Sequence, residues 1–327
     1  MSNFLPEGKL NNDLLVEILN SIKNKNPKTK PIIGEDSAVL DITKYSEILL
    51  SSDPITFETK EIGSNLLDVC SNDIYASGGI PKWILITTLI PINTTFSSLK
   101  KIISELNKSA EKLGIDIIGG HTEVTKSVNK IILSGSIIGV YNQDFRANQK
   151  IQENQSIILA GYAGIEASKI IINNSSKKNQ NLIKLEKYSN NESINIKKIA
   201  NSGISTKKII KMHDPTEGGI ATALHEICEF GNVSCEIEFE KIIFLPNFIE
   251  VCKDLKLDPI GSISSGCLII ICKKEDENII VSKYESNGIP VNIIGKTTNK
   301  KNNNIININK EKINLKRFAQ DEILKII

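Results

Sequence analysis

Four acidic residues in the N-terminal half have the types and positions expected of metal ligands: Asp36, Asp53, Asp73 and Glu123. Asp53 ends the apolar run EILLSSD, which predicts a carboxylate at the C-terminal edge of a strand, where ligands gather in α/β folds. Asp73 continues the apolar stripe of a helix predicted over residues 62–77, and a carboxylate there is unfavourable unless it is paired or binds a metal. Mg²⁺ prefers carboxylate oxygens and usually brings phosphates with it. The four acids therefore predict a magnesium site, and the alternative for each is an ordinary solvated position.

Glycines lie close to three of these acids, among them Asp36 and Glu123. Gly34 precedes Asp36, and Gly119–Gly120 precede Glu123 in IDIIGGHTEVT, at a predicted strand end. His121 in the same stretch has three interpretations: a metal ligand, a phosphate contact or a turn residue with ordinary hydrogen bonds. A Walker A loop is excluded, because the stretch ending IIGKTT has proline where that motif needs its first glycine.

The stretch MHDPTEGGIATALHEIC, residues 212–228, predicts a second candidate site. Asp214 is expected to cap a helix over 214–230, with Pro215 at the first helical position and Glu217 completing a capping box. Gly218 and Gly219 are then surprising, because each costs about 1 kcal/mol relative to alanine inside a helix. Either a close backbone contact or an anionic ligand at a bare helix N-terminus explains them, and the sequence leaves both open.

Alternating strand-like and helix-like segments in both halves position these residues, which indicates an α+β or α/β architecture. Residues 97–114 form the clearest predicted helix, with one apolar face and Gly114 as its stop. The runs WILITTLIP and GCLIIIC predict buried strands, and residues 173–203 predict one variable helix with flexible joins. We expect a domain boundary near 145–155, which gives domains 1–150 and 151–327.

Composition excludes several classes of protein. The net charge of +2 and the 5% aromatic content argue against nucleic acid as the main partner. The apolar runs are too short to span a membrane, and no signal pattern opens the chain. Six cysteines without a CxxC pair indicate free thiols in a cytoplasmic protein and argue against a structural zinc site.

Taken in order, the motifs of this chain resemble those of one superfamily. The stretches GEDSAVLD, SSDP, SNDIYASGGIPKW, IIGGHTEVT, AGIEASKI, MHDPTEGGIATAL and SSGCLII span nearly the whole chain. They resemble the aminoimidazole ribonucleotide (AIR) synthase-like enzymes, which include thiamine monophosphate kinase, selenophosphate synthetase and the hydrogenase maturation ATPase. Each motif is weak alone, whereas the ordered set is specific and looks closest to the hydrogenase maturation branch.

The resemblance implies a two-domain α+β chain, in which an N-terminal mixed sheet forms a barrel across a homodimer and an α/β sandwich follows. ATP and Mg²⁺ are the implied cofactors. By position, the acids implied to hold Mg²⁺–ATP are Asp36, Asp53 and Asp73, with Glu123 adding charge beside His121. The remaining residues implied to bind the nucleotide or substrate are Gly34, Asn72, Gly119, Gly120, Asp214, Glu217, Gly218 and Gly219.

The implied activity is phosphoryl transfer from ATP to an oxygen or amide of a small-molecule or protein substrate, with Asp73, Glu123 and His121 at the reacting centre. Glu217 matches an acid of the thiamine phosphate kinase branch, where the hydrogenase branch has arginine. The chain ends DEILKII and its last cysteine is Cys272, so we expect no self-modification of a terminal cysteine and no nickel–iron cyanide-ligand role. The alternatives are a nucleotide-binding regulatory or scaffold protein, and thiamine monophosphate kinase, for which SSDPITFET is a partial match.

Overall fold

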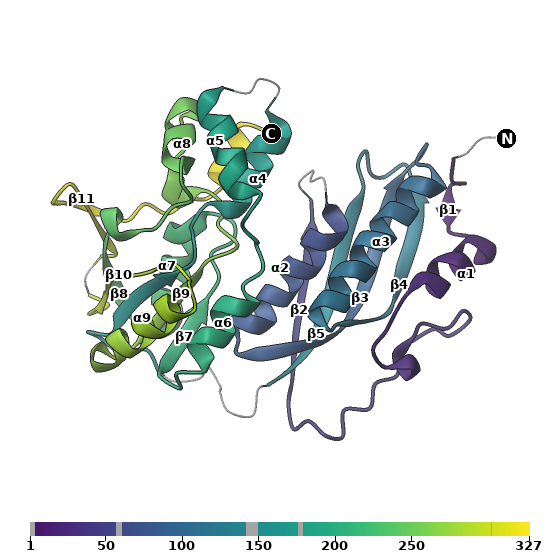
Figure 1. The fold of residues 1–327 in the computed structure, drawn as a ribbon, viewed down its shortest axis with the longest axis horizontal. Coiled ribbons are helices and arrows are strands. Elements are labelled where there is room, and N and C mark those ends of the chain that lie inside the picture. Colours follow the sequence, from purple (N-terminus) through teal and green to yellow (C-terminus); the bar gives the residue numbers. More distant parts are fainter. Residues whose placement is uncertain (1–3, 57–60, 142–149, 176–178, 302) are drawn as a thin grey trace. The chain divides into compact units, whose positions relative to one another are not determined.

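The computed structural model describes residues 4–56, 61–141, 150–175, 179–301 and 303–327 (Figure 1). The chain divides into two compact units: Met1–Ile74 with Gly79–Tyr141, and Tyr75–Gly78 with Asn142–Ile327. The linker predicted near 145–155 lies partly outside the described residues, so the domain assignment stays a prediction. No described helix has the length and apolar character needed to cross a membrane.

The N-terminal unit contains a five-stranded mixed sheet in the order β1-β4-β3-β5-β2, in which only β3 and β4 run parallel. Helices α2 and α3 lie on one face of this sheet (Figure 1). The elements are β1 (Gly8–Lys9), α1 (Asn12–Ser21), β2 (Ile48–Ile55), α2 (Ile62–Ala76), β3 (Gly79–Pro91), α3 (Phe96–Leu113), β4 (Asp116–Thr125) and β5 (Ile132–Tyr141).

Two of the helices in this unit, α2 and α3, were predicted from the sequence to within a residue at each end. Helix α3 buries the expected stripe of Leu99, Ile102, Leu106, Ala110 and Leu113, and it ends at Gly114 in the left-handed conformation. This agreement follows from physics that is local, since a stripe at helical spacing and a C-terminal glycine do not depend on distant residues.

The C-terminal unit contains a seven-stranded sheet in the order β12-β11-β8-β10-β6-β9-β7, antiparallel except between β8 and β11. The strands are β6 (Ser156–Ala160), β7 (Ile209–His213), β8 (Ser234–Glu238), β9 (Leu268–Cys272), β10 (Val291–Thr298), β11 (Ile305–Ile308) and β12 (Glu311–Asn314). The helices are α4 (Ile165–Asn174), α5 (Gln180–Ser189), α6 (Lys197–Ile204), α7 (Gly219–Gly231), α8 (Phe248–Leu255) and α9 (Glu277–Ser286). The single helix expected over 173–203 is thus wrong, because α5 and α6 both lie there.

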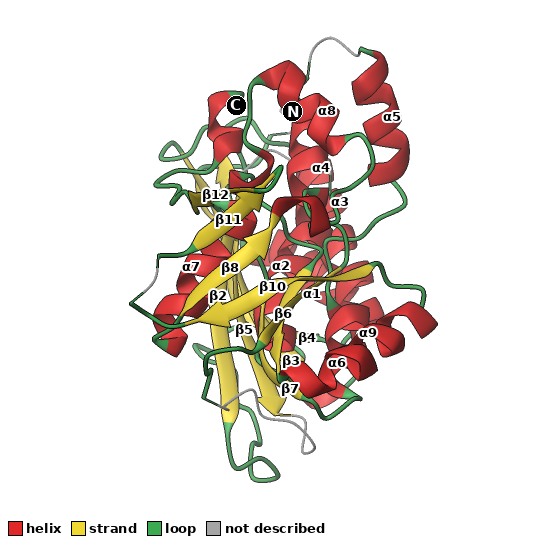
Figure 2. Cartoon of the chain, turned by 90° about the vertical axis from the view of Figure 1, so that its left-hand side faces the viewer, coloured by secondary structure: helices red, strands yellow, loops and turns green. Residues whose placement is uncertain are grey.

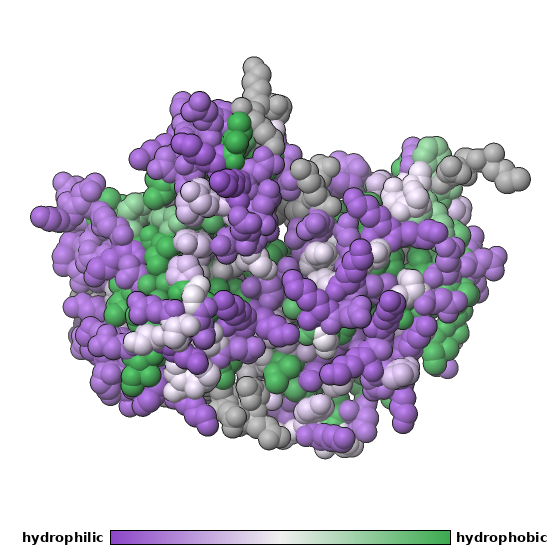
Figure 3. Space-filling model, in the orientation of Figure 1, coloured by the Kyte–Doolittle hydropathy of each residue, from purple (hydrophilic) through white to green (hydrophobic). Residues whose placement is uncertain are grey.

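Apolar cores cover both faces of this second sheet. One core packs α7 against β6, β8, β9 and β10, and the other packs α6 and α9 against β6, β7 and β9. Figure 2 shows α7 on one side of the strands and α6 and α9 on the other. The face of the molecule seen in Figure 3 carries mostly hydrophilic side chains, with apolar ones scattered among them.

Candidate functional site

Asp53 and Asp73 come together on the helix-covered face of the N-terminal sheet. The alternation of β2 turns Ser51 and Asp53 toward α2, and the Ser51 hydroxyl donates a hydrogen bond to the Asp73 carboxylate. Cys70 of α2 lies beside both acids: burial, with smaller contributions from the charges of Asp53 and Asp73, raises the pKa of its thiol to about 12. Asp73 is therefore held against the sheet rather than lifted into solvent by the end of the helix.

The strand positions predicted for these acids need correction. Strand β2 continues to Ile55, so Asp53 lies within it rather than at its edge, and the sheet pairs it with Gly135 of β5. Asn72 is almost fully buried on α2, next to Asp73 in the chain. Gly34 and Asp36 lie in an exposed stretch before β2 that has no helix or strand.

His121 and Glu123 lie on the opposite face of the same sheet. Both are within β4, where a bulge after Ile117 pairs His121 with exposed Thr87 of β3, and the Nε2 atom of His121 is 3.4 Å from Oε2 of Glu123. Gly119–Gly120 lie within β4, so the prediction of a strand end there is wrong. A Cβ atom on Gly120 would lie within 1.8 Å of the Ile86 carbonyl oxygen, so no side chain fits there.

The four acids therefore do not form one cluster within the described part of the chain. Two strands, β5 and β3, separate β2 from β4, which places their backbones roughly 14 Å apart at the usual strand spacing. Among the described residues, no group of three or more His, Cys, Asp or Glu side chains is arranged to hold a metal ion. The pair of Asp53 and Asp73 offers the hard oxygen ligands that suit Mg²⁺, while Asp36 and Glu123 lie elsewhere.

In the C-terminal unit, the helix predicted over 214–230 begins later than expected, at Gly219. Gly218 is its N-cap residue, in the left-handed conformation with φ of 76°, and no side chain caps the helix. The capping box from Asp214 to Glu217 is therefore wrong. Gly219, with φ of 62°, is the first helical residue, and a Cβ atom there would lie 2.5 Å from the carbonyl oxygen of Ser262. Close packing of two backbones thus explains Gly219.

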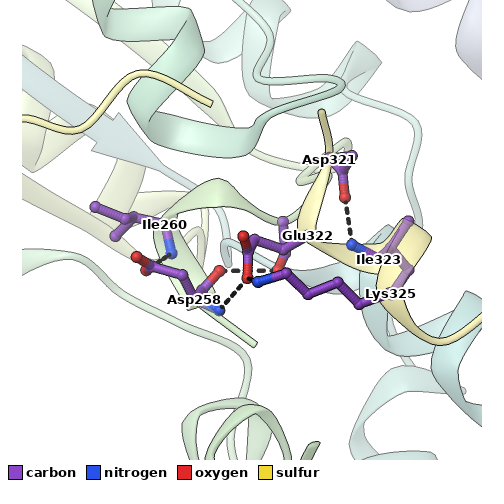
Figure 4. A network of polar contacts seen from close by, with 7 residues as sticks. Asp258, Ile260, Asp321, Glu322, Ile323 and Lys325 are labelled. Carbon is purple, nitrogen blue, oxygen red and sulfur yellow. Dashed lines mark hydrogen bonds and ion pairs between the residues drawn. The ribbon is translucent and has the colours of Figure 1, made fainter. Parts of the chain in front are cut away.

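The N-terminus of α7 is not bare. The Gly218 N–H donates to Oδ2 of Asp321 at 2.7 Å, so a carboxylate from the C-terminal segment takes the place expected for an anionic ligand. The other oxygen of Asp321 accepts a hydrogen bond from the Ile323 N–H at 2.9 Å (Figure 4). Burial and, to a smaller extent, the charge of Glu217 raise the pKa of Asp321 to about 6, against the lowering effect of the backbone hydrogen bonds.

Glu166 is a residue that the sequence analysis did not select. It lies in the first turn of α4, and its pKa is raised to about 7, mainly by burial. A hydrogen bond from Ser265 lowers this pKa, and the charges of Asp321, Asp214 and Glu217 raise it. The available signal was its place in AGIEASKI, an acid directly after a Gly-rich turn. Asp321 had no local signal at all.

The two histidines of α7 and its surroundings have structural partners. Nε2 of His213 lies 2.9 Å from Oε2 of Glu226. His225 accepts at Nδ1 from the Asn304 side-chain amide at 2.8 Å and contacts the Leu315 carbonyl oxygen through Nε2 at 3.2 Å. These contacts join α7 to the strands and to the C-terminal segment.

Two descriptions of one protein family match this chain. Residues 34–141 match the N-terminal domain of AIR synthase related proteins, and residues 152–307 match their C-terminal domain. The chain belongs to the AIR synthase related family, as the ordered motifs predicted. Its relatives include a hydrogenase expression/formation protein of Methanocaldococcus jannaschii, 29% identical over 248 residues that cover 74% of this chain and 72% of the relative.

Carbamoyl dehydratase HypE of Bradyrhizobium diazoefficiens is 25% identical over 260 residues, 76% of this chain and 73% of its own. Among solved structures, HypE of E. coli shares the fold with a TM-score of 0.81 at 19% identity, over 97% of this chain and 98% of that one. HypE in complex with ATP has a TM-score of 0.79 at 18% identity, over 95% and 94%. The two-domain α+β fold predicted from the sequence is confirmed, and the barrel across a dimer stays a prediction.

Proposed function

We propose that this chain is an ATP-dependent enzyme that transfers a phosphoryl group to an oxygen or amide of a small-molecule or protein substrate. The observation that carries the proposal is the placement of Asp53 and Asp73 on the helix-covered face of the N-terminal sheet, where both charges act on Cys70 and Ser51 donates to Asp73. Family membership and the structure of HypE with ATP support the choice of nucleotide. Mg²⁺, when bound, supplies charge neutralisation for the phosphates.

Asp53 and Asp73 are the residues that would hold the metal ion. Ser51 orients the Asp73 carboxylate by donating to one of its oxygens, which leaves the second oxygen for a ligand. The placement of Asp36, Asn72 and the glycines at 34, 119 and 120 around the nucleotide is part of the same proposal. His121 and Glu123 would join the site only through the opposite face of the sheet.

A thermal-shift titration with ATP and Mg²⁺, separately and together, tests this proposal. A ligand that binds the native state raises the melting temperature by mass action, so we expect a shift that needs both components. Asp73→Asn should remove this shift and the ATP hydrolysis that accompanies it, whereas Asp13→Asn, on the exposed start of α1, should keep both. No shift with either component would rule the proposal out, and a shift without turnover would favour a nucleotide-binding regulatory protein.

The open face of the N-terminal sheet supports a homodimer as part of this proposal. Leu50 on the edge strand β2 is 69% exposed, and Leu85 of β3 is 37% exposed on the same face. An uncovered apolar sheet face beside an unpaired edge is a common association surface. Light scattering should give twice the monomer mass for the wild type and for Ile183→Lys, which changes an exposed residue of α5, but a lower mass for Leu50→Lys. A monomeric wild type would contradict the dimer.

A further inference from the structure

A groove lies between helices α1 and α3 of the N-terminal unit. The two helices pack side by side (Figure 1), and the side-chain amide of Asn107 on α3 donates to the Ser21 carbonyl oxygen at the end of α1 at 3.1 Å. The groove has a volume of about 330 Å³. Its floor is apolar, because Ile18, which is 5% exposed, and the partly buried Ile103 both line it.

The rim of this groove carries an excess of positive charge. Its charged residues are three lysines and two glutamates: Lys23, Lys100, Lys108, Glu17 and Glu111. Lys100 already pairs with Glu17 at 2.7 Å, so these two charges offset each other. Lys23 and Lys108 are both exposed, and neither forms an ion pair with another described residue. Their two ammonium groups are therefore available to an anionic partner.

A lysine-rich turn extends this positive surface beyond the end of α1. Residues 23–30 read KNKNPKTK, with four lysines and no acid, and Lys23 at their start lines the groove. The buried Asp116 carboxylate fixes the turn, because it accepts hydrogen bonds from two backbone N–H groups and one hydroxyl of the turn. Asp116 follows closely after α3, so the turn lies beside the C-terminal end of that helix, where Lys112 is also exposed.

The lining of the groove favours an acidic peptide over other anionic partners. An aliphatic side chain gains free energy by leaving water for the apolar floor, and carboxylates form charge-assisted hydrogen bonds with lysines. A nucleic acid would bring its phosphates close to Glu17 and Glu111 as well. Among the described residues that line the groove, none is aromatic, so a base would find no ring on which to stack.

We propose that the groove between α1 and α3 binds an acidic segment of a partner protein, with an aliphatic side chain over Ile18 and Ile103 and carboxylates at Lys23 and Lys108. The lysine-rich turn attracts the acidic segment and orients it on the groove. This inference goes beyond the proposed enzyme and does not depend on it, because none of the residues proposed to hold the metal ion or the nucleotide lines the groove.

A fluorescence-anisotropy titration of the full chain tests this inference. The probe is a short fluorescein-labelled peptide that repeats aspartate, leucine and glutamate. It is compared with a peptide of the same length and charge that has glycine in place of leucine, and with a short single-stranded oligothymidylate. Lys23→Gln with Lys108→Gln removes the two unpaired charges of the rim. Lys184→Gln with Lys187→Gln, on the exposed side of α5, is the control with the same loss of charge.

We expect the leucine peptide to bind the wild type and the α5 control alike, and the variant of the rim roughly fivefold more weakly. Added salt should weaken binding, because exposed charges are screened, and the glycine peptide should bind less tightly than the leucine peptide. The inference is overturned if the wild type does not bind the leucine peptide, or if the two double variants bind it alike. Equal binding of the glycine peptide, or tighter binding of the oligothymidylate, would overturn it as well.

Discussion

Two carboxyl groups, one in each unit, differ in what surrounds them. Asp116 at the start of β4 is 6% exposed, and its oxygens accept from the Lys25 N–H at 2.6 Å, the Asn26 N–H at 3.2 Å and the Thr29 hydroxyl at 2.8 Å. Glu166 has one hydrogen bond from a serine and three acids nearby. The Asp116 carboxylate links the segment before β2 to the sheet through these hydrogen bonds. In Glu166, by contrast, the Oε2 atom has no hydrogen-bond partner among the described residues.

The difference separates a structural acid from an acid whose ionisation opposes folding. A carboxylate whose donors are all supplied by the fold contributes to stability. A carboxyl crowded by like charges is unfavourable in the folded protein when it is ionised.

The largest effect is expected where the fold holds the start of α7 in place. In Gly219→Ala the new Cβ atom would meet the carbonyl oxygens of Ser262 and Ile260 at 2.5 and 2.6 Å with a positive φ, so we expect a loss of about 3 kcal/mol or more in unfolding free energy. Gly288→Ala has a similar φ of 64° and open space, and should lose only roughly 1–2 kcal/mol. Urea unfolding measures the free energy of unfolding of both variants. Equal losses would mean that residues 260–262 move to make room for the new Cβ atom.

The next effect tests the structural acid. Asp116→Asn replaces an ionised acceptor of three hydrogen bonds by a neutral amide, one half of which donates. We expect a loss of about 2 kcal/mol, because hydrogen bonds to a charged group are the stronger kind. Asp13→Asn on the exposed start of α1 is the control, and urea unfolding midpoints report the difference. If Asp116→Asn lost no more unfolding free energy than Asp13→Asn, the Asp116 carboxylate would not stabilise the fold.

Ionisation of Glu166 should destabilise the folded protein, whereas ionised Asp116 stabilises it. The pKa values of Glu166 and Asp321 are raised by folding to about 7 and about 6, so their protonated forms favour the folded state. That contribution is fully present below the unfolded pKa values and is lost as the pH rises through the folded ones. The wild type should therefore lose roughly 2–3 kcal/mol of this contribution from Glu166 between about pH 5 and pH 8, and Asp321 adds roughly 1–2 kcal/mol.

Glu166→Gln should flatten this dependence and should be more stable than the wild type at about pH 8, where the carboxyl is ionised. Unfolding midpoints at the two pH values give the measurement, and Glu285→Gln should follow the wild type at both. If Glu166→Gln were less stable than the wild type at the higher pH, the carboxyl would be structural after all.

The sequence predicted those parts of the fold that depend on neighbours in the chain. The apolar stripe of α3, its stop at Gly114 and the buried strand β9 all follow from local periodicity. The predicted start of α7 was wrong, because the capping signal at Asp214 reflects only the neighbouring residues. The real start of the helix is fixed by contacts with Ser262 and Asp321, which are distant in the sequence.

The candidate site was predicted only in part for the same reason. The stripe on α2 placed Asp73 against the sheet near Asp53, as the structure has it. The face of His121 depends on a bulge in β4, and one extra residue turns every following side chain to the other face. The crowding around Glu166 needs acids from three separate segments, which no short motif contains.

The smallest effect tests whether a flexible partner can replace donors fixed by the backbone. The exposed carboxylate of Glu17 on α1 lies 2.7 Å from Nζ of Lys100, and both side chains are more than half exposed. Because the lysine loses side-chain freedom and water screens the pair, Glu17→Gln should lower the unfolding free energy by only about 0.3 kcal/mol. A double-mutant cycle with Lys100→Met isolates the pair, and high salt should abolish the coupling. A coupling as large as the loss in Asp116→Asn would show that distance alone, rather than the number of fixed donors, decides which acids stabilise this fold.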